Sequence, residues 1–201
     1  MFIVGITGGI GSGKSTVSKY LEDKGLPVLD ADKISFEVTD VDGSAVEEVA
    51  SVFGDKAVSA DGSMNRKYIS DIVFNDRMKL DFLSSIIHKH VFEVMAKRIE
   101  EESEKKTKCI VLDVPIPVQK FVDLSDQVWV VTCDTEVRIA RLIDRGLSRE
   151  EAQRRIAMQL TDDEYADLAD FKIDNSGSLE DTYARVDELI KTQLMERGIR
   201  I

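Results

Sequence analysis

Short runs of apolar residues alternate along the chain with segments that have apolar residues at helical spacing. The apolar runs predict five strands, at residues 2–6, 27–29, 109–113, 127–133 and 171–174. The first run is apolar on both faces, which is typical of a central strand in a parallel sheet. Because helical segments separate the strands, the pattern predicts an α/β fold with a parallel sheet.

Apolar residues three and four positions apart predict the helices. They fall at residues 14–24, 45–53, 67–74, 77–104, 136–144, 149–160 and 179–197. The longest helix has one apolar stripe, which we expect to be core rather than a cofactor site. The stripe consists of Leu80, Leu83, Ile87, Val91, Val94, Met95 and Ile99.

The predicted strands lie in the first and last parts of the chain, and the stretch between them is helical. This distribution predicts a core made of residues 1–39, 106–135 and 161–201. Residues 40–105 are then a helical insertion, and residues 136–160 a helical hairpin that could cover a site as a lid.

Composition and charge narrow the class of protein. The 201 residues are 43% hydrophobic, which excludes a disordered chain and suffices for one compact domain. A net charge of −11 opposes a general attraction to nucleic acid or anionic lipid. We expect no nucleic-acid partner, and a monomer or weak homo-oligomer.

The cysteines and the N-terminal segment indicate a cellular location. Cys109 and Cys133 lie in apolar surroundings without metal-knuckle spacing, so we interpret them as small buried hydrophobes, as in a reducing cytosol. The chain has no signal-like start and no apolar run of about 18 residues. We therefore expect a cytoplasmic protein with no membrane association.

Residues 8–16 read Gly-Gly-Ile-Gly-Ser-Gly-Lys-Ser-Thr and match the pattern GxxxxGK[ST]. The match lies directly after a predicted strand and at the start of a predicted helix, where glycines let backbone N–H groups surround a nucleotide phosphate. We expect Lys14 to reach the β- and γ-phosphates and Ser15 to bind Mg²⁺. The predicted ATP-binding residues here are Gly9, Gly11, Ser12, Gly13, Lys14, Ser15 and Thr16.

Aspartates follow two of the predicted strands. Asp113 ends the third strand and suits a role in holding Mg²⁺ through water. Asp32 follows the second strand, which we expect to lie beside the first, where a carboxylate could accept a hydroxyl proton. Asp32 fits equally well as the N-cap of a helix starting at Lys33, and Asp30 as a residue that caps the strand end.

The arginines of the predicted hairpin favour phosphoryl transfer to a small acceptor. The chain has no Asn-Lys-x-Asp segment, which a guanine-reading GTPase would normally show. Cations on a mobile cover could close over the transferring group. Each of these arginines taken alone also fits an ordinary solvated helix. They are Arg138, Arg141, Arg145, Arg154 and Arg155.

The ordered set of motifs resembles the dephospho-coenzyme A kinase family over essentially the whole chain. The phosphate-binding loop at residues 8–16, the P-loop, is shared by a vast superfamily. The specificity of the match therefore comes from the order and spacing of the other motifs. They are residues 5–17, Asp30-Ala31-Asp32, Asp61-Gly62, Asn65-Arg66, residues 72–74, His88, Arg141-Leu142, Arg145, Arg155-Ile156, Gln159, Ala169-Asp170, Asn175 and Gly177.

This resemblance implies a fold and a reaction. The implied fold is the three-layer P-loop NTPase fold, similar to nucleoside monophosphate kinases, with a five-stranded parallel sheet, a helical substrate-binding insertion and a helical lid. The implied reaction is the ATP-dependent phosphorylation of the ribose 3′-hydroxyl of dephospho-coenzyme A, the last step of coenzyme A synthesis, with Mg²⁺ as the metal.

The resemblance also implies roles for single residues. Asp32 would be the base for the 3′-hydroxyl, with Lys14 and Arg141 as further catalytic residues. Arg66 and His88 would lie in or near the acceptor site, together with Asp32. Arg141 and Arg145 would belong to the lid side, and Arg145 and Asn175 to the ATP site, with Asn175 near the adenine.

The chain departs from the family pattern on the acceptor side. Lys89 replaces the usual proline after His88, residues 116–119 replace the usual Leu-Leu-Phe-Glu, and Ser35-Phe36 stands where a basic or imidazole side chain is common. Two alternatives stay open. One is a related P-loop kinase for another small nucleoside or nucleotide hydroxyl, and the other is a non-catalytic nucleotide-binding regulator.

Overall fold

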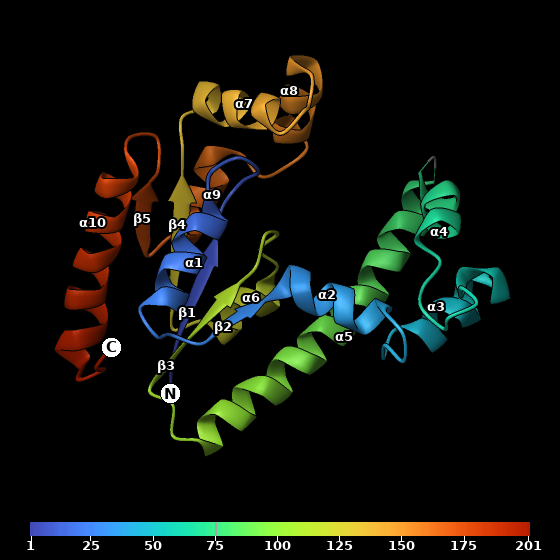
Figure 1. Ribbon diagram of the computed structural model, residues 1–201, viewed down its shortest axis with the longest axis horizontal. Helices are drawn as coiled ribbons and strands as arrows, with labels where there is room; N and C mark the ends of the chain where they lie inside the picture. Colours follow the sequence, from blue (N-terminus) through green and yellow to red (C-terminus); the bar gives the residue numbers. More distant parts are fainter. Residues whose placement is uncertain (75) are drawn as a thin grey trace. The chain divides into compact units, whose positions relative to one another are not determined.

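The computed structural model describes residues 1–74 and 76–201, which form two compact units. The first, here called the core unit, contains Met1–Leu29 and Glu102–Ile201, and the second, the helical unit, contains Asp30–Glu101. Figure 1 shows the strands gathered in the core unit, where β1 to β5 form one sheet.

The sheet has five parallel strands in the order β2-β3-β1-β4-β5. The strands are β1 (Phe2–Thr7), β2 (Val28–Asp30), β3 (Cys109–Asp113), β4 (Gln127–Thr132) and β5 (Phe171–Asp174). The predicted parallel α/β fold is confirmed. The expectation that β2 lies beside β1 is wrong, because β3 pairs with β1 from Phe2↔Cys109 to Ile6↔Asp113 and separates the two.

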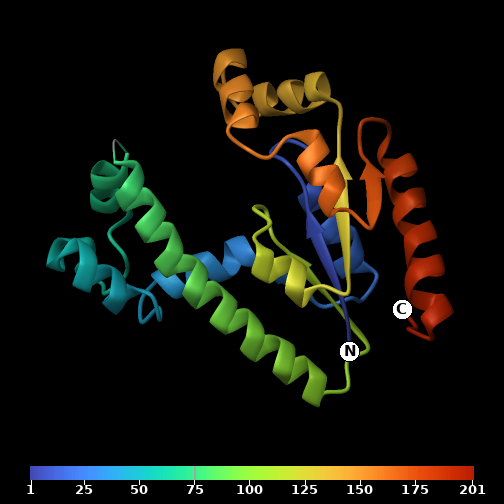
Figure 2. The same ribbon diagram turned by 180° about the vertical axis from the view of Figure 1, so that it is seen from behind.

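Helices cover both faces of the sheet and give three layers. One face packs against α1 (Lys14–Asp23) and α10 (Leu179–Leu189), and Val4, Trp129 and Ile173 belong to its buried cluster. The other face is covered by α6 (Gln119–Leu124) beside β1 and α9 (Asp162–Leu168) beside β4, as Figure 2 shows from behind.

The predicted core residues of the sheet are buried. Trp129 is 0% exposed, and Cys109 and Cys133 are free buried thiols. Burial raises the pKa of the Cys109 thiol to about 12, so this thiol stays neutral and packs as an apolar group. A Cβ at Gly5 would overlap Phe121, so glycine lets α6 pack closely against β1.

The hairpin predicted at residues 136–160 consists of α7 (Thr135–Asp144) and α8 (Arg149–Ala157) in the core unit. Its helices share a small apolar cluster of Ile139, Leu142 and Ala152. Ile10 packs against this cluster. The hairpin is therefore joined to the glycine-rich loop by apolar contacts.

The helical unit contains α2 (Ala31–Thr39), α3 (Val46–Phe53), α4 (Arg66–Val73) and nearly all of α5 (Arg77–Glu104), with a 3-10 turn at Asp55–Ala57 between α3 and α4. The proposed division put α2 with the core. Its contacts assign it here, because the Met64 N–H donates to Thr39 O at 2.9 Å and Arg98 pairs with Glu37.

Several elements differ from the predicted pattern. The helices α6 and α9 were not predicted, and α2 was considered only as an alternative, with its start at Lys33 instead of Ala31. The closing helix loses regular geometry after Leu189 and continues as a π-type turn over Ile190–Leu194 and a 3-10 turn over Met195–Arg197. In α5 the stripe residue Leu80 is 45% exposed, whereas Ile86 and Phe92 are buried. Among the described helices, none is long and apolar enough to cross a membrane.

Candidate functional site: the phosphate loop and the acceptor helix

The glycine-rich loop follows β1 directly and leads into α1, as the sequence predicts. Gly13 is the N-cap of α1 and provides no side chain to cap its first N–H groups, whereas Ser148 and Thr161 cap α8 and α9. The positive end of the α1 dipole and its first N–H groups are therefore not blocked by a capping side chain, an arrangement that favours a bound anion.

Gly13 meets two local demands that other residues would not. Its φ of 91° lies in the left-handed region, and a Cβ at this position would overlap Asn175 Nδ2. The Asn175 Nδ2 donates to Ser12 O at 2.6 Å, and its Oδ1 accepts from Thr182 Oγ1 at 2.9 Å. Asn175 is 1% exposed and thus supports the loop from the protein side.

Lys14 and Asp113 meet at the carboxyl ends of neighbouring strands. The Lys14 Nζ forms an ion pair with a carboxylate oxygen of Asp113, and their side chains are 15% and 4% exposed. The β1–β3 register explains the pairing, because Ile6 lies opposite Asp113 immediately before the loop begins. Ser15 lies on the first turn of α1 and is exposed. The structure thus brings the predicted lysine and aspartate together.

The predicted lid arginines fall into two groups. Arg141 donates through Nη1 to the carbonyl oxygens of Gly11 (3.3 Å) and Ser12 (3.2 Å), and through Nη2 to Asn175 O at 2.8 Å. Arg138, only 3% exposed, donates to Ile10 O at 3.0 Å. Both arginines hold the backbone of the loop.

The remaining arginines of the hairpin face solvent. Arg154 and Arg155 on α8 pair with Glu151, one turn earlier on the same helix. This arrangement matches the alternative of a solvated helix with alternating charges. Arg145 follows α7 directly and is also exposed.

On the acceptor side, Asp32 lies in the first turn of α2 and is exposed. The N-cap of this helix is Asp30, whose Oδ1 accepts from the N–H groups of Asp32 (2.9 Å) and Lys33 (3.1 Å). The alternative of Asp32 as a helix cap is therefore wrong, and Asp30 has this role. The Asp32 carboxylate does not serve as the cap.

Arg66 and Phe36 form a pair in the helical unit. The Arg66 guanidinium lies 4.3 Å from the centroid of the Phe36 ring, and its Nη2 donates to Thr39 Oγ1 at 2.8 Å. Phe36 is 62% exposed and lies one helical turn after Asp32 on α2. Residues four positions apart share a helix face, so Asp32, Phe36 and Arg66 belong to one surface.

His88 lies on α5 of the same unit and is exposed. Partial desolvation lowers the pKa of its imidazole from the ordinary value of 6.5, so the neutral form is favoured at neutral pH. Lys89 departs from the family pattern. Its Nζ forms an ion pair with Glu48 Oε2 at 3.0 Å.

The glycine-rich loop joins a central parallel strand to a helix that has no capping side chain, and its lysine lies beside the aspartate of the neighbouring strand. These features define a P-loop nucleotide-binding protein. A family model described as dephospho-CoA kinase matches residues 2–181. The chain belongs to the dephospho-CoA kinase family, a family of kinases.

Curated relatives match nearly the whole chain. A dephospho-CoA kinase of Fusobacterium nucleatum subsp. nucleatum is 41% identical over 195 residues, covering 96% of this chain and 98% of the relative. A dephospho-CoA kinase of Carboxydothermus hydrogenoformans is 40% identical over 186 residues, covering 92% of this chain and 90% of the relative.

Solved structures share the fold. A Thermus thermophilus protein superposes with a TM-score of 0.78 at 31% identity, covering 96% of this chain and 97% of the other. The dephospho-CoA kinase from Campylobacter jejuni gives a TM-score of 0.72 at 24% identity, with 98% of each chain covered. A Bacteroides thetaiotaomicron shikimate kinase gives 0.53 at 14% identity, covering 94% and 97%, a likeness of fold alone.

Sequence reasoning missed how the loop is held. It treated Arg138 as a cation over the transferred group and Gln159 as a family marker, yet both contact the backbone of Ile10. No local pattern signals these contacts, because they join residues more than a hundred positions apart.

Proposed function

We propose that this chain transfers the γ-phosphoryl group of ATP to the ribose 3′-hydroxyl of dephospho-coenzyme A. The observation that carries the proposal is the loop between β1 and α1, uncapped at Gly13, with Lys14 beside Asp113. Family membership supports the choice of acceptor. Asp32 and Arg66, in one helical unit, supply an exposed carboxylate and a cation for it.

The residues beside the loop fit a nucleotide-bound magnesium ion. Mg²⁺ takes few protein ligands and keeps waters and substrate phosphates as the others. A hydroxyl on Ser15 and the buried carboxylate of Asp113 suit that demand, Ser15 by direct contact and Asp113 through water. Among the described residues no group of three or more His, Cys, Asp or Glu side chains could hold a metal ion. When bound, the ion would neutralise phosphate charge.

The proposed transfer is a direct in-line displacement. The 3′-oxygen forms a bond to the γ-phosphorus, the bond from that phosphorus to the β–γ bridging oxygen breaks, and ADP leaves with the electron pair. Asp32 accepts the proton of the 3′-hydroxyl. Lys14 stabilises the negative charge on the phosphates, and Arg141 fixes the loop carbonyls of Gly11 and Ser12.

The remaining site residues complete the proposed assignment. Arg66 binds the acceptor with its guanidinium oriented by Phe36 and Thr39, and His88 contributes to the same side. Arg145 belongs to the ATP side. Asn175 contributes by supporting the loop at Ser12, near the predicted adenine site.

The partners and the location follow from the same reasoning. The small molecule dephospho-coenzyme A is the substrate, and the net charge of −11 argues against a nucleic-acid partner. We propose a cytoplasmic monomer or weak homo-oligomer without membrane association. The buried free thiols Cys109 and Cys133 fit a reducing compartment.

The proposal is tested by ADP release from Mg·ATP with and without dephospho-coenzyme A, together with the mass of the product. We expect strong stimulation and a product heavier by one phosphoryl group. Stimulation by another nucleoside hydroxyl alone would favour the related kinase. ATP turnover that no small-molecule acceptor stimulates would favour a regulator.

A further inference from the structure

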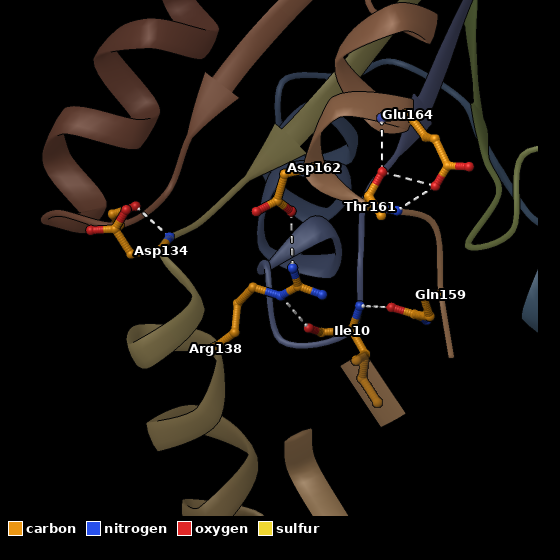
Figure 3. Close-up of polar contacts among 8 residues, drawn as sticks. Ile10, Asp134, Arg138, Gln159, Thr161, Asp162 and Glu164 are labelled. Carbon is orange, nitrogen blue, oxygen red and sulfur yellow. Dashed lines mark hydrogen bonds and ion pairs between the residues drawn. The ribbon is translucent and has the colours of Figure 1, made fainter. Parts of the chain in front are cut away.

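The backbone of Ile10, in the phosphate loop, is held on both sides. Its N–H donates to Gln159 Oε1 at 2.6 Å, and its carbonyl oxygen accepts from Arg138 Nε at 3.0 Å. Figure 3 shows the two side chains reaching this residue from α7 and from the segment after α8. Both backbone hydrogen-bonding groups of Ile10 thus have partners from the hairpin region.

The side chain of Ile10 is held by the same region. It packs against the apolar cluster of Ile139, Leu142 and Ala152, which belongs to α7 and α8. Three independent contacts therefore fix one residue: a donor, an acceptor and an apolar surface. All three contacts are made by the protein itself, without a bound nucleotide.

Arg138 is constrained as closely as the peptide that it holds. It is 3% exposed, and its Nη1 pairs with Asp162 at 3.2 Å. Its Nη2 is buried without a hydrogen-bond partner among residues 1–74 and 76–201. A Cβ at Gly9 would overlap this nitrogen, so the glycine at position 9 makes room for the guanidinium. Burial of the guanidinium costs desolvation free energy, and the contacts of Arg138 give its side chain a defined position.

We propose that Arg138 and Gln159 are positioning residues that clamp the backbone of Ile10 and keep the phosphate loop in its nucleotide-binding shape. The expected effect of the clamp on kcat rests on the proposed phosphoryl transfer. Its expected effect on ATP binding rests on the loop geometry alone. A loop that is already ordered loses less entropy when the nucleotide binds. It also keeps the reacting phosphoryl group within the narrow geometry that transfer requires.

Two substitutions remove one side of the clamp each. Arg138→Met removes the bond to Ile10 O and keeps a long apolar stem, and Gln159→Leu removes the acceptor of the Ile10 N–H. The affinity for Mg·ATP is measured by calorimetry without any acceptor, and kcat and KM are measured with dephospho-coenzyme A. We expect the Kd of Mg·ATP to rise about tenfold and kcat to fall about 10–100-fold in each variant. The KM for dephospho-coenzyme A stays within about twofold of the wild type.

The double variant tests whether Arg138 and Gln159 act together on the backbone of Ile10. We expect it to be no more than about threefold worse than the more affected single variant, because either loss already frees Ile10. Fully additive effects would contradict a shared clamp.

Asp162→Asn is the matched control, because it removes the carboxylate charge but keeps an oxygen that can accept from Arg138 Nη1, and it leaves the bond from Arg138 Nε to Ile10 O in place. Its Kd for Mg·ATP and its kcat should stay within about twofold of the wild type. An equal loss in this variant would mean that Arg138 acts as a tie between α7 and α9, and would overturn the proposal.

The proposal would also be overturned if folded Gln159→Leu bound Mg·ATP with wild-type affinity and had the wild-type kcat. If Arg138→Met does not fold, Gln159→Leu alone decides the test. Folding is checked by the melting temperature. If the wild type does not phosphorylate dephospho-coenzyme A, the proposed function fails, while the calorimetric comparison still decides the clamp.

Discussion

The core unit and the helical unit differ in how the residues of the proposed site are supported. In the core unit, every residue of β3 is buried, and the loop after β1 is supported by Arg138, Arg141 and Asn175. In the helical unit, the residues of the proposed acceptor side lie on the surface: Asp32 is exposed, and Phe36, which contacts Arg66, is 62% exposed.

This difference shows where the chemistry depends on backbone shape and where it depends on side chains. The phosphate loop needs glycine conformations and buried supports, so a small change there should remove function and stability together. The surface of Asp32, Phe36 and Arg66 depends on particular side chains of α2 and α4. Changes there should alter turnover or acceptor affinity alone.

The largest expected effect is that of Gly13→Ala in the core unit. The new Cβ would overlap Asn175 Nδ2, and the φ of 91° adds strain of about 1–3 kcal/mol. We expect loss of measurable ATP binding by calorimetry and a lower melting temperature. Gly25→Ala is the control, because its φ of 95° brings similar strain with no atom within 4 Å of the new Cβ. ATP binding by Gly13→Ala at the wild-type level would refute the account of the loop.

Asp32→Asn in the helical unit should separate turnover from ATP affinity. Loss of a general base typically lowers the rate by about 10²–10⁴-fold. We expect a fall of that size in kcat, measured by ADP release, with the Kd of Mg·ATP unchanged. Asp30→Asn serves as the comparison, because it removes a neighbouring carboxylate, keeps an oxygen that caps α2 and leaves the Asp32 carboxylate in place. Equal turnover by wild type and Asp32→Asn would rule out Asp32 as the base.

Arg66→Gln should affect acceptor binding alone. Hydrogen bonds to charged groups contribute about 1.5–3 kcal/mol, so the KM for dephospho-coenzyme A should rise at least about tenfold. The KM for ATP should not change. Lys67→Gln, the neighbouring exposed cation on α4, is the control and should leave both constants near wild type. A rise in both KM values for Arg66→Gln would mean that the two units are not separable in this way.

The smallest expected effect concerns His88 and pH. Its folded-state pKa is lowered from 6.5, so below this pH the unfolded chain binds the proton more readily than the folded chain. The free energy of unfolding should therefore fall as the pH drops through about 6.5 and level off below the folded-state pKa. This fall is measured by the denaturant midpoints of wild type and His88→Gln at pH 7.5 and at pH 5.5, a range of about two pH units around the titration. A wild-type loss no greater than that of His88→Gln would show that His88 does not contribute.

The sequence predicts most elements of both units. The helices α3, α4 and α5 of the helical unit lie within one residue of their predicted ranges, whereas α6 and α9 of the core unit were missed. The strand positions and the loop at residues 8–16 follow from local pattern, and Asp113 lies at the end of its strand as predicted. The ion pair between Lys14 and Asp113 was not predicted. The start of α2 lies two residues before the alternative considered, because the helix follows a strand without a break. Its cap, Asp30, lies only two residues before Asp32, and either aspartate fits that role by position.

Contacts between distant segments could not be predicted. The clamp on Ile10 joins three parts of the chain, and the pairing of Arg66 with Phe36 depends on how α4 packs against α2. Each side chain has an ordinary local interpretation, on a solvated or apolar helix face. Only the fold brings them together.

The measurement that tests the central claim most directly is the position of the new phosphate in the product. Dephospho-coenzyme A is incubated with Mg·ATP and the wild-type chain, and phosphorus–proton couplings of the product are recorded by NMR. The account predicts a phosphate coupled to the ribose 3′-proton. A phosphate on any other hydroxyl, or no phosphorylated product from a chain that binds ATP, would contradict it.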